Sequence, residues 1–198
     1  MIKRIFDFVC SLFGIIILFP LFILISILIV FDSEGGVFYL QTRVGKNNTD
    51  FKLFKFRTMK IGSDKKGLLT VGMNDGRITR SGFWLRKYKL DELPQLLNVL
   101  IGDMSFVGPR PEVRKYVQLY SPQQMKVLIL KPGITDIASI QYVDENELLA
   151  AQQNPEEFYI RQVMPAKLEI NLRYIANQSF AEDLKIILKT ILRILKSG

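Results

Sequence analysis

Residues 8–31 read FVCSLFGIIILFPLFILISILIVF and contain no charged side chain, although Asp7 and Asp32 flank them. As a straight helix this run would be about 36 Å long, which exceeds the ~30 Å hydrocarbon core of a bilayer. A signal peptide would be shorter and would end in small residues, unlike the Phe-Asp-Ser-Glu that follows here. The alternative is a buried core helix, but so uniformly apolar a run is unusual in a soluble domain of this size. We therefore expect the segment to enter a membrane.

Two features bear on whether this helix spans the membrane or re-enters on the same side. Pro20 lies at the centre of the run, and proline inside a helix removes a hydrogen bond at a cost of ~3 kcal/mol. Spanning helices nevertheless tolerate proline when the freed carbonyl finds another partner. Positive flanks prefer the cytoplasm, and both flanks are positive: Lys3 and Arg4 before the run, and Arg43, Lys46, Lys52, Lys55, Arg57 and Lys60 after it. A re-entrant helix broken at Pro20 satisfies both flanks, whereas a single span satisfies one.

The composition restricts the partners and cofactors of this chain of 198 residues, which is long enough for one domain with a core. Its formal charge of +8 suits an anionic partner such as a nucleic acid, a phosphate-bearing substrate or an acidic membrane surface. With one cysteine, Cys10, and no histidine, an internal disulfide and a Cys/His zinc site are excluded. A bound metal would need oxygen ligands, which favours Mg²⁺.

Beyond the apolar run, the sequence predicts an α+β, mostly helical domain. We expect a small hairpin from two strands, Val37–Gln41 and Phe51–Phe56, joined by a turn at 43–48, and a loop over residues 57–82. Helices are expected at Leu93–Leu100, at Glu112–Tyr120, at Pro122–Leu130 with Ser121 as N-cap, and from Asn154-Pro155 onward with a bend or break near Pro165; Ile134–Val143 is expected to be extended. The chain thus divides into a membrane-inserted segment, residues 1–34, and a second domain, residues 35–198.

The carboxyl end predicts a basic amphipathic helix over residues 180–196. Ser179 and Glu182 have the spacing of a capping box. One face carries Leu184, Ile187, Leu188, Ile191 and Leu195, whereas Lys185, Lys189, Arg193 and Lys196 fall elsewhere. Such a helix either packs on a core or lies among lipid headgroups, and the apolar amino terminus favours the second reading. Residues 83–89 mix aromatic and basic side chains in the same way.

The segment 90–111, LDELPQLLNVLIGDMSFVGPRP, carries the candidate chemistry. Asp91 and Glu92 precede a helix whose first turn suits Pro94, so they are either an ordinary acidic helix start or a catalytic pair. Arg110 lies between two prolines, which restrict its backbone, and a guanidinium matches phosphate oxygens in a bidentate way. Because the chain has no histidine, carboxylates are the candidates for acid–base or nucleophilic work near neutral pH.

Four blocks of sequence resemble the bacterial sugar transferases of the monotopic phosphoglycosyl transferase family, in its minimal form. They are Lys3-Arg4 with Asp7; Gln41, Arg43 and Gly45 running into KFRTM at 55–59; LDELPQ at 90–95 continuing into Gly102-Asp103-Met104-Ser105; and VGPRP at 107–111 with KPGIT at 131–135. Their order and spacing cover most of the chain through residue 136.

The resemblance implies transfer of a sugar-1-phosphate from a UDP-sugar to undecaprenyl phosphate, with release of UMP, at the cytoplasmic face of the bacterial inner membrane. It implies that Asp91 is a nucleophile that forms a covalent phosphosugar intermediate and helps to hold Mg²⁺, with Glu92 as its partner in a dyad. Arg110 matches the phosphate-binding arginine, and Lys55 and Arg57 lie in a block that helps to build the site. We add Arg86 to the candidate phosphate-binding residues. The partners would be the two substrates and membrane lipids; a homodimer is left open.

Two departures from the family pattern stand out. The family commonly has Ser before the helix-breaking proline, where this chain has Phe19, and many members continue Gly-Trp-Ala-Gln after Thr135, where this chain has Asp136-Ile137-Ala138-Ser139. The second region is a candidate for choosing the sugar, whose identity the sequence leaves open. A non-catalytic membrane adaptor with a basic surface would explain the charge and both apolar helices, but neither the acidic pair nor the PRP turn. Nucleic-acid binding rests on charge alone, so we expect no nucleic-acid partner.

Overall fold

The computed structural model describes residues 2–63 and 75–197 and shows a mostly helical α+β fold, as the sequence predicts. The helices are α1 (Ile2–Asp32), α2 (Arg80–Lys87), α3 (Gln95–Ile101), α4 (Arg114–Val117), α5 (Ile137–Gln141), α6 (Glu145–Ala150), α7 (Pro155–Phe158), α8 (Met164–Ala176) and α9 (Phe180–Ser197). Shorter turns are η1 (Lys46–Asn48), η3 (Leu90–Glu92) and η4 (Gln124–Ile129), which are 3-10 helices, and η5 (Tyr159–Val163), a π-helix. The strands are β1 (Phe38–Val44), β2 (Asp50–Phe56), β3 (Ser105–Val107) and β4 (Gly133–Thr135).

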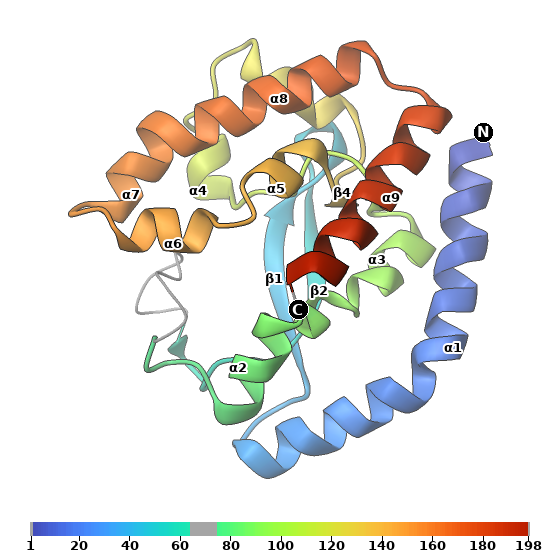
Figure 1. Cartoon of the computed structure of the whole chain (residues 1–198), viewed down its shortest axis with the longest axis vertical. Coiled ribbons are helices and arrows are strands. Elements are labelled where there is room, and N and C mark those ends of the chain that lie inside the picture. Colours follow the sequence, from blue (N-terminus) through green and yellow to red (C-terminus); the bar gives the residue numbers. More distant parts are fainter. Residues whose placement is uncertain (1, 64–74, 198) are drawn as a thin grey trace.

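The apolar run forms α1, which stays helical across Pro20 but changes direction along its length (Figure 1). Only 11% of its most apolar window is buried within the described protein, so it is not a core helix. Its length and composition are sufficient to cross a membrane. Whether it re-enters or spans stays a prediction.

Polar residues near the start of α1 fasten it to the rest of the protein. The Arg4 guanidinium donates to the carbonyls of Val99 (2.6 Å) and Leu100 (2.8 Å), which lie in the last turn of α3. Asp7 is buried and accepts a hydrogen bond from the Phe106 backbone N–H (3.1 Å). Because these carbonyls and this amide lack helical partners, Arg4 and Asp7 satisfy groups that would otherwise be unpaired.

The predicted hairpin is confirmed, with a first strand that runs three residues further than expected. β1 and β2 pair antiparallel with Gln41 opposite Leu53, and η1 supplies the turn. Asn98 of α3 is fully buried and fixes this helix to the edge of β2. Its side chain accepts from the Phe54 N–H (2.9 Å) and donates to the Lys52 carbonyl (2.7 Å). The residues that follow on β2 are thereby held beside the chain that leads into α3.

The segment predicted as a loop at 57–82 ends earlier than expected, because α2 begins at Arg80. Thr79 caps this helix by accepting from the Gly82 N–H (3.0 Å). Gly82 lies against the Thr58 backbone so closely that a Cβ there would come within 2.1 Å of the Thr58 carbonyl oxygen. The prediction also covered residues 64–74, which lie outside the described part of the chain.

Several predicted elements of the second half differ from the structure. The helix expected at Glu112–Tyr120 shortens to α4, and Pro122–Leu130 forms the 3-10 turn η4, with Ser121 accepting from the Gln124 N–H (3.3 Å). The prediction of extended backbone over Ile134–Val143 is wrong beyond Thr135, because Asp136 caps a new helix, α5, through the Ser139 N–H (2.7 Å). Near Pro165, where a bend or break is expected, the chain instead stays helical, with the π-helical turn η5 immediately before α8.

The core is distributed over several clusters. The largest packs α8 and η5 against α4, η4 and α6, and includes Tyr116, Val127, Leu149, Val163 and Leu168. A second packs Ile25 and Ile29 of α1 against Phe56 and Leu85. In Figure 1, α1 runs down the right and then along the bottom of the molecule, α8 lies across the top, and the hairpin lies between them.

Candidate active site

The PRP turn, Pro109-Arg110-Pro111, is held in place where two segments of the chain cross closely. The Gly108 N–H donates to the Thr135 carbonyl (3.1 Å), and the Gly133 N–H donates to the Pro109 carbonyl (3.1 Å). A Cβ on Gly133 would come within 2.2 Å of the Gly108 nitrogen, so this crossing requires glycine. The Arg110 N–H donates to the buried Asp136 carboxylate (3.0 Å). The backbone that carries Arg110 is thus fixed from both sides.

Glu92 is the centre of a compact ion-pair cluster. Arg110 donates to both of its carboxylate oxygens, and Lys55 Nζ donates to Oε1 at 3.0 Å. Burial alone would raise the pKa of Glu92, but Arg110 and Lys55 together hold this pKa well below its usual range. The same carboxylate raises the pKa of Arg110, so both groups are charged near neutral pH. Glu92 is therefore a fixed anion that orients two cations.

Asp91 differs from its neighbour in its hydrogen bonding and in the direction of its pKa shift. Its side chain is buried, and it accepts no hydrogen bond from any residue in the part of the chain that the structure describes. Burial raises its pKa; Lys55 opposes this effect, and Glu92 reinforces it. Asp91 thus combines a poorly solvated carboxylate with nearby cations, which is the environment expected of a reactive group.

Of the other predicted cations, the structure places Arg86 near Asp91 and Arg57 away from it. Arg86 lies near Asp91 and donates to the Thr58 hydroxyl (2.9 Å); burial lowers its pKa, while the charge of Asp91 raises it. Arg57 is buried elsewhere, where it donates to the Gly36 carbonyl (2.6 Å) and to the Ser33 hydroxyl (2.7 Å). It closes the turn after α1 and is not brought to the Asp91–Glu92 pair. Pro20 lies in α1 and takes no part in this cluster.

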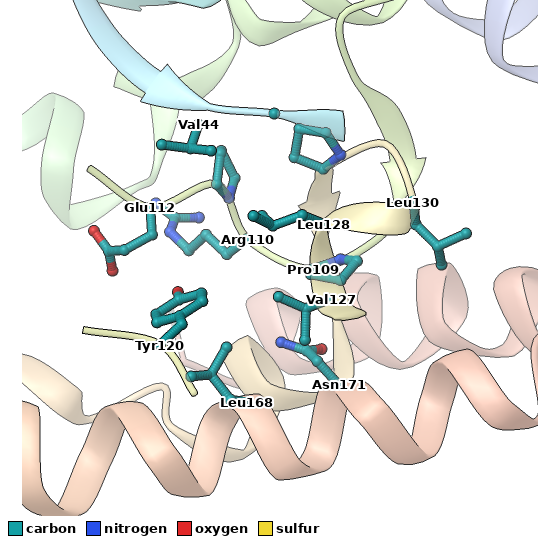
Figure 2. A pocket seen from close by; sticks show the side chains of 13 residues that line it. Val44, Pro109, Arg110, Glu112, Tyr120, Val127, Leu128, Leu130, Leu168 and Asn171 are labelled. Carbon is teal, nitrogen blue, oxygen red and sulfur yellow. The ribbon is translucent and has the colours of Figure 1, made fainter. Parts of the chain in front are cut away.

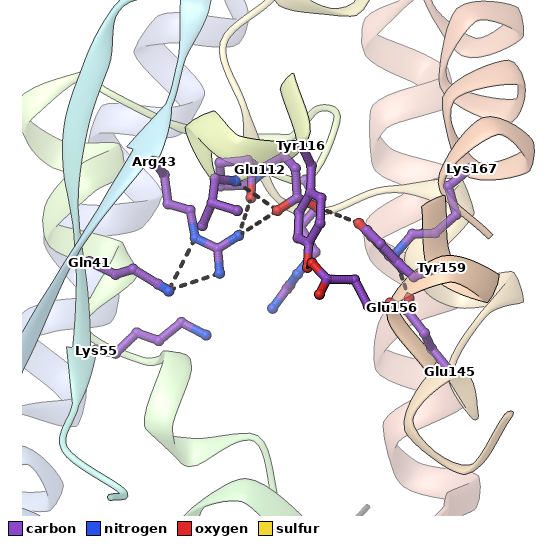
Figure 3. A network of polar contacts seen from close by, with 12 residues as sticks. Gln41, Arg43, Lys55, Glu112, Tyr116, Glu145, Glu156, Tyr159 and Lys167 are labelled. Atoms are coloured by element: carbon purple, nitrogen blue, oxygen red, sulfur yellow. Dashed lines mark hydrogen bonds and ion pairs between the residues drawn. The ribbon is translucent and has the colours of Figure 1, made fainter. Parts of the chain in front are cut away.

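A polar network that the sequence did not predict continues from this cluster toward α8 (Figure 3). The Arg43 guanidinium donates to Gln41 Oε1 (2.8 Å and 3.0 Å), to the Pro111 carbonyl (3.1 Å) and to Glu112 (3.1 Å). The Tyr159 hydroxyl donates to the other oxygen of Glu112. Arg43 thereby holds the far end of the PRP turn. Arg43 and Gln41 belong to a block of sequence that resembles the family, but the resemblance did not predict these contacts.

On the same side, α6 and α8 contribute an ion pair between Lys167 and Glu145, at 2.5 Å. Figure 3 shows this pair beyond Tyr159, and the charge of Glu145 contributes to the raised pKa of Arg110. No motif marked these residues in the sequence. They are brought together by the packing of α6 and α8, which the sequence patterns do not predict.

A small cavity of about 30 Å³ lies behind the PRP turn and is lined by Pro109, Arg110, Tyr120, Leu168 and Asn171, among others (Figure 2). The buried Oδ1 atom of Asn171 has no hydrogen-bond partner among the described residues. The cavity has room for a water molecule or two, and far too little for a nucleotide sugar. It is therefore too small to be the donor site.

The donor atoms for a metal are few. The described residues contain no group of three or more His, Cys, Asp or Glu side chains that could hold an ion. Glu92 is already paired with two cations, whereas the Asp91 carboxylate is free to act as a ligand. One carboxylate together with substrate phosphate oxygens is a common way to bind Mg²⁺, so the residues fit an ion that arrives with the donor.

Residues 1–197 match the family model described as "Bacterial sugar transferase". The chain is 38% identical over 197 residues to the UDP-N-acetylgalactosamine-undecaprenyl-phosphate N-acetylgalactosaminephosphotransferase of Aeromonas hydrophila, covering 98% of this chain and 44% of that protein. It is 36% identical over 204 residues to the exopolysaccharide production protein PSS of Rhizobium leguminosarum bv. phaseoli, covering 100% of this chain and 96% of that protein.

The UDP-glucose:undecaprenyl-phosphate glucose-1-phosphate transferase of Escherichia coli K12 is 33% identical over 198 residues, covering 98% of this chain and 40% of that protein. The chain thus spans less than half the length of two of these relatives and nearly all of the third. The family match extends through both the apolar helix and the cluster around Glu92. The chain therefore belongs to the bacterial sugar transferase family.

Proposed function

We propose that this protein transfers a sugar-1-phosphate from a UDP-sugar to undecaprenyl phosphate and releases UMP, through a covalent phosphosugar intermediate on Asp91. One observation carries the proposal: Asp91 has an unpaired buried carboxylate directly beside a glutamate that holds Lys55 and Arg110. Two of the relatives are named as sugar phosphotransferases that act on undecaprenyl phosphate. The product would enter polysaccharide or glycoprotein glycan assembly.

In the first step, an Asp91 carboxylate oxygen attacks the β-phosphorus of the UDP-sugar. The new bond joins Asp91 to that phosphorus, and the bond from it to the bridging oxygen breaks, so that UMP leaves with the electron pair. In the second step, a phosphate oxygen of undecaprenyl phosphate attacks the same phosphorus and Asp91 leaves. The carboxylate is regenerated, and the sugar is linked to the lipid through a diphosphate.

Electrostatic repulsion is the main obstacle to the first step, because a carboxylate must approach a charged diphosphate. Two unit charges about 4 Å apart repel by about 4 kcal/mol at an effective dielectric of 20. Arg110 and Lys55 offset this repulsion, and Glu92 keeps both cations in place without itself donating a proton, since its pKa is held well below its usual range. Arg86 supplies a third cation near Asp91.

Asp91 would also be the protein ligand for Mg²⁺, which supplies charge neutralisation on the diphosphate when it is bound. The chain's own contribution is to keep this carboxylate free of other hydrogen bonds. Lys55 and Arg110 would bind phosphate oxygens of the donor. These separate roles, with Asp91 for the metal and the cations for the phosphates, are consistent with a site that has many cations and few carboxylates.

Under this proposal the protein acts at the cytoplasmic face of the inner membrane, and its exposed apolar surface supports a membrane location. Most side chains of α1 are exposed, and so are Trp84 of α2 and Tyr88, which follows α2 directly. On α9, Ile186 is buried whereas Leu184, Leu188 and Ile191 are exposed, so much of the apolar face expected from the sequence is left uncovered by protein. Lipid is the partner that such exposed apolar surfaces suit.

The test is release of UMP from a panel of UDP-sugars by the purified protein in detergent or nanodiscs. Release that requires both Mg²⁺ and undecaprenyl phosphate for multiple turnovers is expected for one sugar of the panel. Absence of UMP with every sugar, together with binding to anionic vesicles, would instead support a membrane adaptor. Arg114→Ala, which changes an exposed cation away from the Glu92 cluster, serves as a control for loss of surface charge.

A further inference from the structure

Asp136 is the first residue at which this chain departs from the family's common Gly-Trp-Ala-Gln continuation, and the structure places it directly against the PRP turn. Its side chain is 1% exposed. It follows β4, which pairs in parallel with β3 just before the turn. The carboxylate therefore lies where two distant segments of the site are joined.

The two oxygens of this carboxylate have different partners. Oδ1 accepts from the Ser139 N–H (2.7 Å), which is the contact of an ordinary N-cap on α5. Oδ2 accepts from the Arg110 N–H (3.0 Å) and from the Ser139 hydroxyl (3.0 Å). A cap needs only the first oxygen. The second one connects α5 to the residue that faces Glu92.

Because Arg110 lies between two prolines, this contact has a large effect on how its backbone is held. Prolines on both sides have no N–H, so the Arg110 amide is the single backbone donor within residues 109–111. The Arg43 guanidinium binds the Pro111 carbonyl, and Asp136 binds the Arg110 amide, so the turn is held at two successive points. Loss of the second contact would let the guanidinium shift relative to Glu92 and to a bound phosphate.

We infer that Asp136 is a positioning residue for the transfer reaction, and that it acts through Arg110. The expected effect on kcat rests on the proposed function. The claim that Asp136 fixes the Arg110 backbone does not depend on any substrate. Asp136 touches neither Glu92 nor any group assigned to the chemistry apart from Arg110. Its effect on the rate should therefore exist only while the Arg110 side chain is present.

The variant that tests this contact is Asp136→Ser, which also removes the carboxylate charge near Arg110. A serine hydroxyl can still cap α5, but it offers no second oxygen to Arg110. We expect kcat for UMP release to fall ~10- to 10²-fold, the scale of a misplaced site group, with a smaller change in KM for the donor. Ser139→Ala is the matched control, because it removes a hydroxyl from the same carboxylate and leaves the Arg110 contact; it should stay within about twofold of the parent protein.

A double-mutant cycle separates positioning from mere stability. In an Arg110→Ala background, Asp136→Ser should change the residual rate by less than about twofold. If the two losses instead multiply, Asp136 does not act through Arg110 and the inference is overturned. A loss of protein yield or a lower Tm with unchanged kcat would overturn it as well.

Hydrogen exchange decides the structural part without any substrate. Because prolines flank Arg110, exchange within residues 109–111 reports on this one amide. Asp136→Ser should speed its exchange at least tenfold, and Ser139→Ala should not; equal exchange in Asp136→Ser and the parent protein would overturn the inference. If the parent protein releases no UMP from any UDP-sugar, the proposed function fails. In that case, the affinity for UDP is measured by calorimetry for the variants of the same double-mutant cycle. An affinity of Asp136→Ser equal to that of the parent protein would overturn the positioning role.

Discussion

At the scale of single residues, the adjacent carboxylates Asp91 and Glu92 have opposite environments. Glu92 is paired with Arg110 and Lys55, whereas Asp91 is buried without a hydrogen-bond partner among the described residues. The pKa of Asp91 is raised by burial, and that of Glu92 is held low despite burial. Such a split between two neighbouring acids assigns them different roles.

This split predicts opposite effects of neutralising the two acids on stability. The pKa of Asp91 is higher in the folded protein, so its charge opposes folding at pH values above that pKa; Asp91→Asn should therefore maintain or raise the Tm while it abolishes transfer. The pKa of Glu92 is lower in the folded protein, so its contribution is present at neutral pH and is lost on acidification through the folded-state pKa. Glu92→Gln should lower the free energy of unfolding by about 2 kcal/mol. Thermal unfolding of both variants at pH 7 in one detergent measures this, and a fall in Tm for Asp91→Asn would contradict it.

The raised pKa of Asp91 also predicts how the first step depends on pH. The attacking form is the anion, so single-turnover release of UMP should decline on acidification, starting at a higher pH than an ordinary aspartate would give. The profile is measured by rapid quench without undecaprenyl phosphate. An inflection at or below the usual aspartate pKa would show that burial does not govern this group in the donor complex.

Arg110 should contribute through its geometry as well as its charge. Arg110→Ala should lower kcat by at least ~10²-fold, the scale of a lost group that stabilises transition-state charge. Arg110→Lys keeps the charge but cannot contact both oxygens of Glu92, so it should recover only part of that loss. Steady-state UMP release measures both variants, and full activity in Arg110→Lys would show that the bidentate contact is dispensable.

At the scale of elements, the start of α1 is coupled to α9 by a buried polar contact. Lys3 Nζ donates to the Asp183 carboxylate (2.5 Å) and to the Val107 carbonyl (2.8 Å), and the Tyr174 hydroxyl donates to the same carboxylate. Asp183 is 4% exposed, so removing its charge would leave Lys3 without its anionic partner. The amphipathic helix α9 is therefore fixed to the point where α1 leaves the domain.

Asp183→Asn should loosen α9, and hydrogen exchange over residues 180–190 should increase at least tenfold. Lys185→Met is a suitable control, because it breaks an exposed pair with Glu182 on the same helix. Exchange in this control should match that of the parent protein. Equal exchange in Asp183→Asn and the control would show that the Lys3 contact does not hold α9.

The elements also show where sequence patterns sufficed. The long apolar helix, the hairpin and the capped terminal helix follow from local signals, and each is present. The prediction of extended backbone over Ile134–Val143 is wrong beyond Thr135, because Asp136 accepts a hydrogen bond from the Ser139 N–H and caps a helix there. Leu184 and Leu188 follow the predicted apolar pattern, yet they are exposed; periodicity identifies an apolar face but not what covers it. The side chains predicted beyond residue 193 lie outside the described part.

At the scale of the whole molecule, the site depends on contacts that no local pattern contains. Lys55 comes from the hairpin, Glu92 from η3, and Arg110 from the turn after β3. The sequence predicted each as a candidate, but not that Glu92 binds the other two. It also grouped Arg57 with them, whereas Arg57 is directed toward Ser33 and Gly36. The pairing follows from the parallel contact of β3 with β4 and from the docking of α3 on β2, both of which join distant residues.

The whole-molecule account predicts that α1 enters and leaves the membrane on one side. In a Cys10→Ser background, a cysteine introduced at Ile2 should react with an impermeant maleimide from the same side as one introduced at Lys126, an exposed residue in η4. Intact and inverted membrane vesicles provide the comparison. Labelling of the two positions from opposite sides would show that α1 spans the bilayer.

The most direct measurement of the central claim is covalent labelling of the protein by a UDP-sugar that carries ³²P in its β-phosphate. In the absence of undecaprenyl phosphate, the protein should retain label on a peptide that contains Asp91, and addition of undecaprenyl phosphate should transfer that label to lipid. Asp91→Asn should take up no label while keeping a normal Tm. Label that persists in Asp91→Asn, or transfer to lipid without any labelled protein, would contradict a covalent intermediate on Asp91.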